Sequence, residues 1–191
     1  MPEKEADWLR GARQLDQEAL ASIYDAFSSA LFRYAVRLLG DPEAAEDIVS
    51  ETFYRFLRSI SAGGGPQNHL KAYLYRVAHN LIVDRYRRNP IIEVDFHSEI
   101  QDVADGLEDP AYQAELSIEK QAVRRNLWKL TEDQRQVIVL KYLEGLSNRE
   151  VSEIMEKPVG AIKSLQHRGL NSLRRIFAKD EIKRSSKDVN T

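Results

Sequence analysis

A run of acidic residues without lysine or arginine divides this chain of 191 residues. Asn89 and Pro90 end a helical pattern, and residues 91–119 then contain Asp and Glu but no Lys or Arg. Charges of one sign repel each other, so this composition favours a solvated linker over a packed element. A metal site at His97 is the alternative, but no second histidine stands nearby. The predicted organisation is a first domain over 1–88, an acidic linker over 89–109, a second domain over 110–184 and a disordered tail over 185–191.

Apolar residues at helical spacing predict that the first domain is all-α. Asp16 and Asp41 are placed to cap helices, and the spacing assigns Tyr24 and Leu57 to the core. Ser61–Gln67 breaks the pattern as a loop, because glycine and proline cost about 1 and about 3 kcal/mol inside a helix. The predicted helices are Glu5–Arg13, Gln17–Leu38, Pro42–Ile60 and Leu70–Arg88.

The third predicted helix shows an acidic face along its first half, formed by Glu43, Glu46, Asp47 and Glu51. The helix dipole favours acids near the first turn by about 0.3–1 kcal/mol each, which accounts for Glu43 and Glu46. Asp47 and Glu51 lie deeper in the helix. They are solvated side chains, ligands of a divalent ion, or contacts for a basic partner surface, and spacing alone leaves all three open.

The fourth predicted helix carries a polar row beside its apolar stripe. At 100° per residue, Arg76, Asn80, Asp84 and Arg87 fall on one line, with Tyr73 at its margin. Charged rows on helices commonly face water alone, and a row of this composition also suits contact with nucleic acid. The helix by itself does not separate these two interpretations.

Capping signals divide the second domain into four predicted helices. Thr131 with Gln134, and Ser147 with Glu150, have the spacing of capping boxes. The last two helices, joined by a short turn that contains Pro158, predict a helix-turn-helix. The predicted helices are Pro110–Trp128, one from the Thr131 cap to Leu143, Asn148–Met155 and a long helix from Val159.

The last predicted helix is basic and exposes Lys163, Ser164, His167 and Arg168 near its start. Residues 161–184 contain seven basic and two acidic side chains, a net charge of +5 with His neutral. A helix of this charge suits the phosphates of a DNA duplex. A short helix, a tight turn and a long helix also occur in protein-binding bundles, so that alternative stays open.

Composition excludes several function classes. The chain has no cysteine, which removes disulfides, thiol nucleophiles and cysteine-ligated zinc. No nucleophile with a base, metal-ligand cluster or phosphate loop has a credible spacing, so we expect neither an enzyme nor a cofactor. The apolar runs are too short to span a membrane and the acidic start lacks the regions of a signal peptide, so we expect a cytoplasmic protein.

Three ordered blocks resemble the extracytoplasmic-function (ECF) sigma factors, the small promoter-recognition subunits of bacterial RNA polymerase in the sigma-70 superfamily. Residues 41–57 resemble their core-polymerase-binding segment, residues 70–88 their minus-ten reading helix, and residues 130–175 their minus-thirty-five domain. The resemblance implies an alternative sigma factor that binds the beta and beta-prime subunits of core polymerase and promoter DNA. It also implies an anti-sigma partner and assistance in strand opening.

The resemblance implies roles for individual residues. Polymerase binding falls to Glu46, Asp47 and Glu51. Minus-ten recognition falls to Arg76, Asn80, Asp84, Arg87 and Arg88, with the loop 61–68 helping to pocket a flipped base. Minus-thirty-five recognition falls to Asn148, Arg149, Lys163, Ser164, His167 and Arg168.

Five positions depart from the family pattern, so the promoter sequence does not follow from the resemblance. Tyr73, His79 and Ser50 stand where relatives often have tryptophan, arginine and glutamine, and Ala161 and Leu165 stand where threonine and arginine are frequent. The spacing of Leu165 permits it to pack inward. The alternative functions are a helix-turn-helix regulator that binds duplex operator without core polymerase, and a helical adaptor that binds neither.

Overall fold

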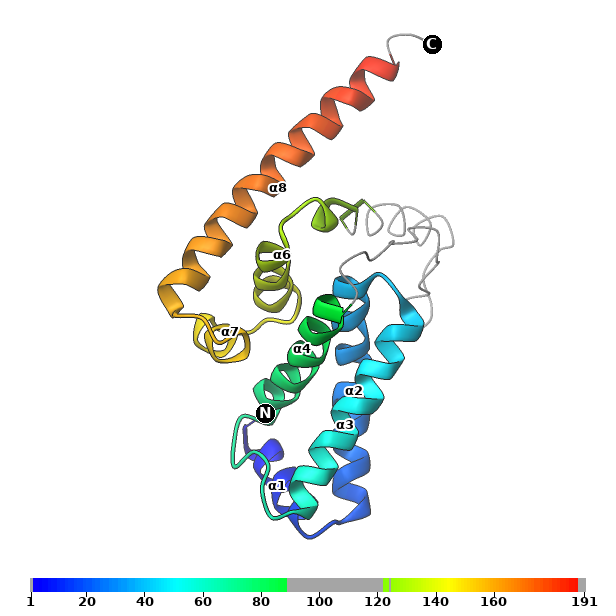
Figure 1. Ribbon diagram of the computed structural model, residues 1–191, viewed down its shortest axis with the longest axis vertical. Helices are drawn as coiled ribbons and strands as arrows, with labels where there is room; N and C mark the ends of the chain where they lie inside the picture. Colours follow the sequence, from blue (N-terminus) through cyan, green and yellow to red (C-terminus); the bar gives the residue numbers. More distant parts are fainter. Residues whose placement is uncertain (1, 89–121, 124, 189–191) are drawn as a thin grey trace.

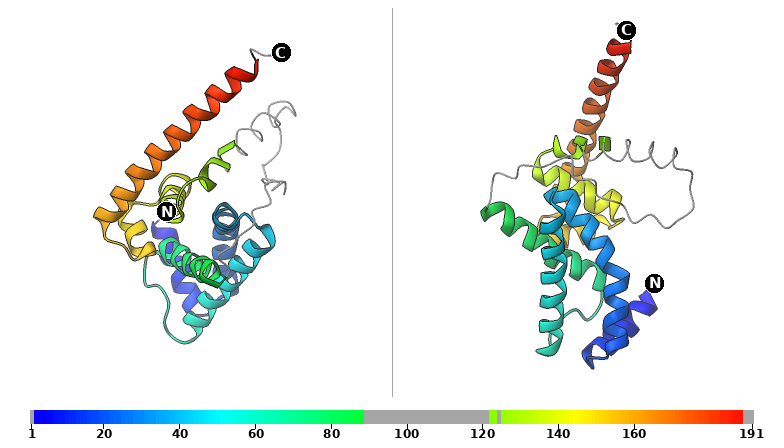
Figure 2. Two further views of the ribbon diagram at one scale, coloured as in Figure 1. Left: turned by 45° about the horizontal axis from the view of Figure 1, so that its top comes forward. Right: turned by 90° about the vertical axis from the view of Figure 1, so that its right-hand side faces the viewer.

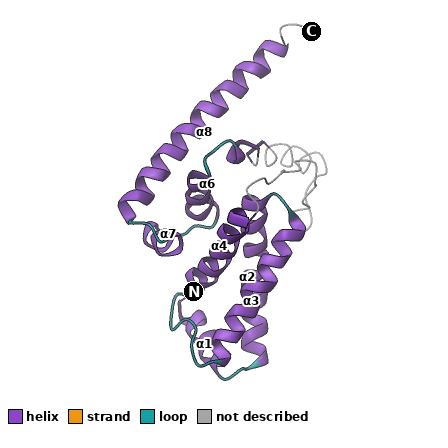
Figure 3. Cartoon of the chain, viewed as in Figure 1, coloured by secondary structure: helices purple, strands orange, loops and turns teal. Residues whose placement is uncertain are grey.

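The structure is a computed structural model that describes residues 2–88, 122–123 and 125–188 (Figures 1 and 3). Every regular element in these ranges is helical and none is a strand, so the all-α prediction is confirmed for them. The acidic linker, His97 and the start of the helix predicted from Pro110 lie outside the described residues. The helices are α1 (Pro2–Arg13), α2 (Gln17–Leu39), α3 (Pro42–Ser61), α4 (Leu70–Arg88), α6 (Glu132–Ile138), the π-helix η1 (Val139–Leu143), α7 (Asn148–Met155) and α8 (Val159–Asp188).

The ends of the first four helices follow the capping signals in the sequence. The Asp16 carboxylate accepts a hydrogen bond from the backbone N–H of Ala19 at 2.8 Å, and that of Asp41 accepts one from Ala44 at 3.1 Å. Gly40 ends α2 with a φ of 71°, in the left-handed region that glycine adopts without strain. The predicted bounds of α4 are confirmed.

Helices α2, α3 and α4 lie side by side and share one core (Figure 1). Leu31 of α2, Phe56 of α3 and Leu74 of α4 are buried there. The rings of Tyr34 and Tyr75 meet edge to face, with their centroids 5.2 Å apart. Full burial of one large apolar side chain stabilises a fold by about 1.5–3 kcal/mol. Several such side chains are buried where the three helices meet, so the core holds α4 in one direction.

Two residues expected in this core are exposed instead. Tyr24 of α2 is 50% exposed and Leu57 of α3 is 42% exposed. Tyr24 covers Phe53 with a ring-to-ring distance of 4.8 Å, so it borders the core without entering it. Helical spacing locates the centre of an apolar stripe, whereas the neighbouring helices decide how far its margins are covered.

The helix expected from the Thr131 cap to Leu143 changes type part-way. Thr131 Oγ1 accepts from the N–H of Gln134 at 3.4 Å, and α6 then gives way to the π-helix η1. The N–H of Glu144 bonds to the carbonyl of Val139, five residues back, at 3.0 Å. The expectation of a continuous α-helix was wrong here, because a π-turn inserts one extra residue that apolar spacing does not reveal.

The predicted helix-turn-helix is formed by α7 and α8. Ser147 Oγ accepts from the N–H of Glu150 at 3.2 Å, and the Glu150 carboxylate accepts from the N–H of Ser147 at 2.7 Å, which confirms that capping box. Glu156 makes the turn with a φ of 53°. The first part of α8 packs on α6 and α7, and its C-terminal part projects away from the other helices (Figure 2). The helix continues to Asp188, so the prediction that the tail is disordered from residue 185 was wrong as far as that residue.

Ser147→Ala is expected to destabilise the helix-turn-helix by about 1 kcal/mol, because it removes the acceptor for one unsatisfied N–H group of α7. Urea unfolding followed by circular dichroism measures this effect. Ser29→Ala, an exposed change within α2, is the control and should leave the midpoint unchanged or slightly raised. Equal midpoints for both variants would contradict the assigned role of the cap.

Helix α4 lies between two sets of helices, with α2 and α3 on one side and α7 on the other (Figure 1). This placement buries more of α4 than its apolar stripe requires, since Tyr75 and His79 are buried as well as Leu74 and Ala78. Among the described residues, no helix has the length and apolar character needed to cross a membrane.

Candidate nucleic-acid interface

The predicted minus-ten row occupies one polar side of α4. Arg76, Asn80, Arg87 and Arg88 are exposed, and Asp84 is half-buried. Asp84 lies 3.6 Å from Arg87 in an ion pair within the helix. The row therefore offers an amide, a carboxylate and guanidinium groups along one line, a set able to pair with base edges and with phosphates.

The glycine loop lies at the start of α4. Gly63 and Gly65 have φ values of 77° and 84°, and a Cβ on Gly65 would lie 2.7 Å from Ile60 Cδ1. Arg13 Nη2 donates to the carbonyl of Pro66 at 2.9 Å, which ties the loop to α1. The loop is thus a defined turn whose positive φ values favour glycine, and at Gly65 a side chain would also crowd Ile60.

Tyr73 lies between Phe56 of α3 and Arg76 of the polar row. Its ring centroid lies 6.1 Å from that of Phe56 and 5.8 Å from the Arg76 guanidinium. The ring is half-buried, so one part packs on the core while another part is available to a stacked base. An aromatic residue therefore remains at the position where relatives often have tryptophan.

The acidic face of α3 is open to solvent. Glu46 and Asp47 are exposed and Glu51 is half-buried. Arg85 of α4 lies 3.7 Å from Asp47, and Arg55 lies 2.7 Å from Glu51. Because exposed ion pairs contribute at most about 1 kcal/mol, a basic partner can replace these arginines at low cost.

The predicted recognition residues of α8 share its exposed side. Lys163, Ser164, His167 and Arg168 are all exposed, while Leu165 is 8% exposed and packs inward, as its spacing permits. Asn148 of α7 is half-buried and Arg149 is exposed, paired with Glu153 at 3.3 Å. The sequence-based division of the start of this helix into a buried stripe and an exposed side is therefore confirmed, whereas the recognition role of the exposed side stays a prediction.

Known family models match both halves of the chain. Residues 23–90 match the model of sigma-70 region 2, and residues 120–173 match that of sigma-70 region 4. The ECF RNA polymerase sigma factor SigW of Bacillus subtilis is 34% identical over 180 residues, covering 87% of this chain and 93% of SigW. The chain belongs to the ECF RNA polymerase sigma factors. SigX of the same organism is 28% identical over 83% of this chain and 84% of its own length.

Solved structures show the same fold for this sigma factor. CnrH, solved in complex with the cytosolic domain of CnrY, aligns with a TM-score of 0.70 and 21% identity over 93% of this chain and 99% of that chain. RpoE of Bartonella quintana, solved in complex with the anti-sigma factor NepR, aligns with a TM-score of 0.63 and 22% identity over 87% of this chain and 98% of that chain. As a member of its family, the chain directs promoter-specific initiation by RNA polymerase.

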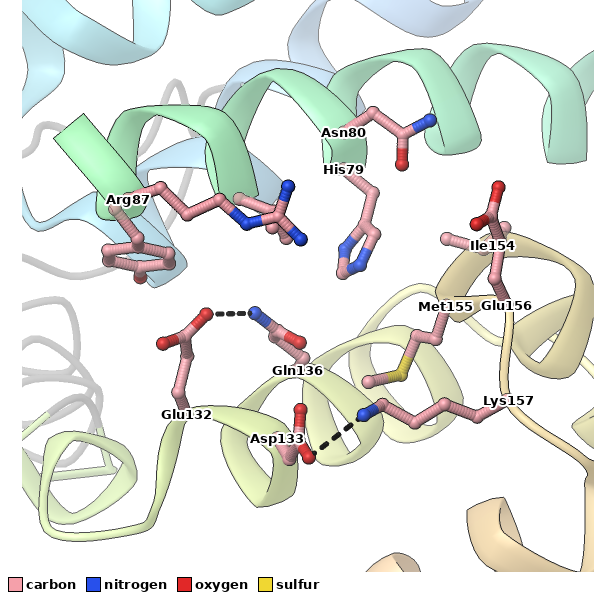
Figure 4. A pocket seen from close by; sticks show the side chains of 12 residues that line it. His79, Asn80, Arg87, Glu132, Asp133, Gln136, Ile154, Met155, Glu156 and Lys157 are labelled. Atoms are coloured by element: carbon pink, nitrogen blue, oxygen red, sulfur yellow. Dashed lines mark hydrogen bonds and ion pairs between the residues drawn. The ribbon is translucent and has the colours of Figure 1, made fainter.

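The sigma factor also has a cavity of about 410 Å³ between α4 and the pair α6 and α7 (Figure 4). Asn80 and Arg87 of the minus-ten row line one wall, and residues of α6, of α7 and of the turn after α7 line the other. Arg76 and Arg88 are not among the lining residues. Sequence reasoning missed this juxtaposition, because nothing local to either helix specifies the docking of one on the other.

His79 is a buried residue of this cavity that sequence reasoning assigned no role. It is 4% exposed, and its Nδ1 lies 2.9 Å from the Tyr34 hydroxyl. Burial lowers the pKa of His79 from 6.5 to about 4, while Asp133 raises the pKa and Lys157 lowers it by smaller amounts. The imidazole is therefore neutral at physiological pH. It contacts the buried Tyr34 hydroxyl and carries no charge to pair with a phosphate.

The described residues contain no group of three or more His, Asp or Glu side chains arranged to hold a metal ion. The divalent-ion alternative for Asp47 and Glu51 thus has no supporting ligand set in this part of the chain. The arginines that pair with these carboxylates supply a simpler account of their local charge balance.

Proposed function

We propose that this sigma factor recognises its promoters through two separate surfaces, the polar row of α4 and the exposed side of α8. The observation that carries this proposal is the exposure of Asn80, Lys163 and Arg168 on helices whose opposite sides are buried. The corresponding domains would span residues 1–88 and 110–184. Each surface then rests on a rigid core, which fixes the direction of the recognising side chains.

The acidic face of α3 is proposed to dock on core polymerase. Its three carboxylates, Glu46, Asp47 and Glu51, stand on one helix side and would meet basic side chains of the beta and beta-prime subunits. Complementary charge accelerates such encounters and fixes their orientation. Glu51 and Asp47 would then exchange their ion pairs with Arg55 and Arg85 for ion pairs with basic side chains of the polymerase.

The polar row of α4 is proposed to capture unpaired bases of the minus-ten element. Asn80 and Asp84 would read base edges, the loop 61–68 would help to pocket a flipped base, and Arg76, Arg87 and Arg88 would hold phosphates. Unstacking a base costs a few kcal/mol, and stacking and hydrogen bonding in one protein site stabilise the unstacked base by a comparable free energy. Opening then requires no chemical step by this chain.

Helix α8 is proposed to enter the major groove of the minus-thirty-five element. Lys163, Ser164, His167 and Arg168 would face base edges, with Asn148 and Arg149 toward the backbone. We also propose an anti-sigma partner and a cytoplasmic location. The family membership supports both, and the complexes reported for two structural neighbours are consistent with such a partner.

Transcription with core polymerase and a promoter library tests this function. Transcripts that appear only when the purified chain and core are both present are the expected result, with little specific duplex binding by the chain alone. Specific duplex binding without core, together with no core-dependent transcripts, would instead favour the helix-turn-helix regulator.

Asn80→Ala is expected to reduce open-complex formation about tenfold while leaving affinity for core polymerase unchanged, because it removes an amide that pairs with a base. Permanganate footprinting measures the open complex, and fluorescence titration measures core binding. Gln17→Ala, which removes an exposed amide from α2, should change neither. A loss of core affinity in Asn80→Ala would mean that the residue is structural.

A further inference from the structure

A single carboxylate, that of Glu144, joins the two halves of the chain. Glu144 follows η1, and its side chain is 5% exposed. It accepts from Arg37 Nη1 of α2 at 2.7 Å and from the Tyr75 hydroxyl of α4 at 2.5 Å. Lys71 Nζ donates to the backbone carbonyl of Glu144 at 2.6 Å. Three side chains of α2 and α4 therefore bind one residue that follows η1 in the second half of the chain.

A second contact, at Arg135 of α6, lies farther along α4. Its guanidinium lies 3.8 Å from the ring centroid of Trp128, and Nη2 donates to the Tyr86 hydroxyl at 3.2 Å. The Tyr86 hydroxyl in turn donates to the carbonyl of Leu38. Arg135 is 5% exposed, so its charge is removed from water at this junction. Two buried polar contacts thus hold α4 against α6 and the turn after η1.

The wall that faces the minus-ten row between these contacts is acidic. Glu132, Asp133 and Glu156 line the cavity opposite Asn80 and Arg87 (Figure 4). Lys157 also lines it and is paired with Asp133 at 3.0 Å, so three carboxylates and one ammonium leave this wall with a net charge of −2. A DNA strand entering this cavity would bring its phosphates against carboxylates, which is unfavourable in a partly enclosed space.

The polymerase-docking face does not share this enclosure. Glu46 and Asp47 on α3 are exposed and are not among the residues that line the cavity. The same conformation therefore leaves the α3 surface open, whereas Asn80 and Arg87, although exposed to water, face an acidic wall across the cavity.

We propose that the second half of the free chain is an intramolecular partner of α4, held by Glu144 as a latch over the minus-ten row. This inference rests on the proposed role of that row in promoter opening. The latched chain can meet core polymerase through α3. The latch must open before a DNA strand can lie along the row, because the exposed Asn80 and Arg87 face carboxylates in the closed chain. The apparent affinity of the row for DNA is then reduced by the fraction of chains that are open.

The latch is expected to be sensitive to one charge. Glu144→Gln keeps the shape of the side chain but leaves Arg37 facing a neutral amide in a mostly buried site. Hydrogen bonds to charged groups are among the stronger ones, so the open-to-closed ratio should rise about tenfold or more. Arg37→Gln removes the other charge of the pair and should have the same direction of effect.

Cysteine labelling of the free, full-length chain tests the latch without polymerase or DNA. Since the chain has no cysteine, Ser29→Cys in α2 and Ala178→Cys in α8 accept a donor and an acceptor dye at defined places. The latch predicts one high-transfer population in the parent chain and a shift to lower transfer in Glu144→Gln and Arg37→Gln. Glu153→Gln, which loses an exposed carboxylate of α7, should match the parent.

Accessibility of the row is the second readout. Asn80→Cys should react with a maleimide carrying a large polyethylene glycol about tenfold faster when Glu144→Gln is added. Ser29→Cys should react equally in both backgrounds. Equal transfer and equal reactivity with and without Glu144→Gln, in chains with unchanged circular dichroism, would overturn the latch. If both readouts shift while core-dependent transcription is absent, the latch stands and the proposed promoter function fails.

Discussion

Reversing the charges of Glu46 and Asp47 together is expected to lower the affinity for core polymerase by a factor of about 100 or more. Each exposed carboxylate contributes up to about 1 kcal/mol with a basic partner, and each lysine replaces that attraction with a comparable repulsion. Both residues are exposed on α3, so the substitutions leave the core shared by α2, α3 and α4 intact. Fluorescence titration of the labelled chain with core polymerase measures the loss.

A double reversal of the same size on another helix is the control. Glu18→Lys with Asp25→Lys changes two exposed acids of α2 and should reduce affinity far less, through net charge alone. The gap between the two variants should narrow as salt increases, because salt screens exposed charges. Equal losses in both variants, at every salt concentration, would remove α3 as the docking surface.

Acidification from pH 6.5 to 4 is expected to destabilise the chain by about 3 kcal/mol through His79 alone. Burial lowers the pKa of His79 from 6.5 to about 4, so the unfolded chain takes up a proton first as the pH falls. The neutral imidazole therefore adds stability above pH 6.5, and this contribution is lost progressively toward pH 4. Urea unfolding at a series of pH values measures it.

Histidine variants separate this effect from the titration of carboxylates in the same range. His79→Gln should be less stable than the parent at pH 7 and should show a flatter fall in stability between pH 6.5 and 4. His167→Gln, a change on the exposed side of α8, should follow the parent curve. Parallel curves for all three chains would show that His79 is not buried in its neutral form.

The prediction for His79 also bears on its departure from the family pattern. An arginine at this position would place a charge against the Tyr34 hydroxyl, which lies in the core between α2 and α4. A neutral imidazole satisfies that hydroxyl without a buried charge. Packing in this chain therefore accounts for the histidine at this position.

Local signals in the sequence determined most helix ends and the exposed sides of three helices. Asp16, Asp41 and Ser147 accept the backbone N–H groups that capping predicts, and α4 has the predicted bounds. Capping and periodicity depend on residues within about one turn, so a linear pattern contains them. The exposure of Asn80, and of the recognition side of α8, followed from the same periodicity, whereas the roles of these residues remain predictions.

Only the tertiary structure decided the second buried side of α4, the π-turn of η1 and the place of Glu144. Tyr75 and His79 are buried because helices distant in sequence dock on α4, and no spacing within residues 70–88 records that docking. In the sequence Glu144 is one more acidic residue, and only the fold places Arg37 and Tyr75 against its carboxylate. A side chain acquires such partners from the path of the whole chain, because contact energy depends on distance in space and not on distance in sequence.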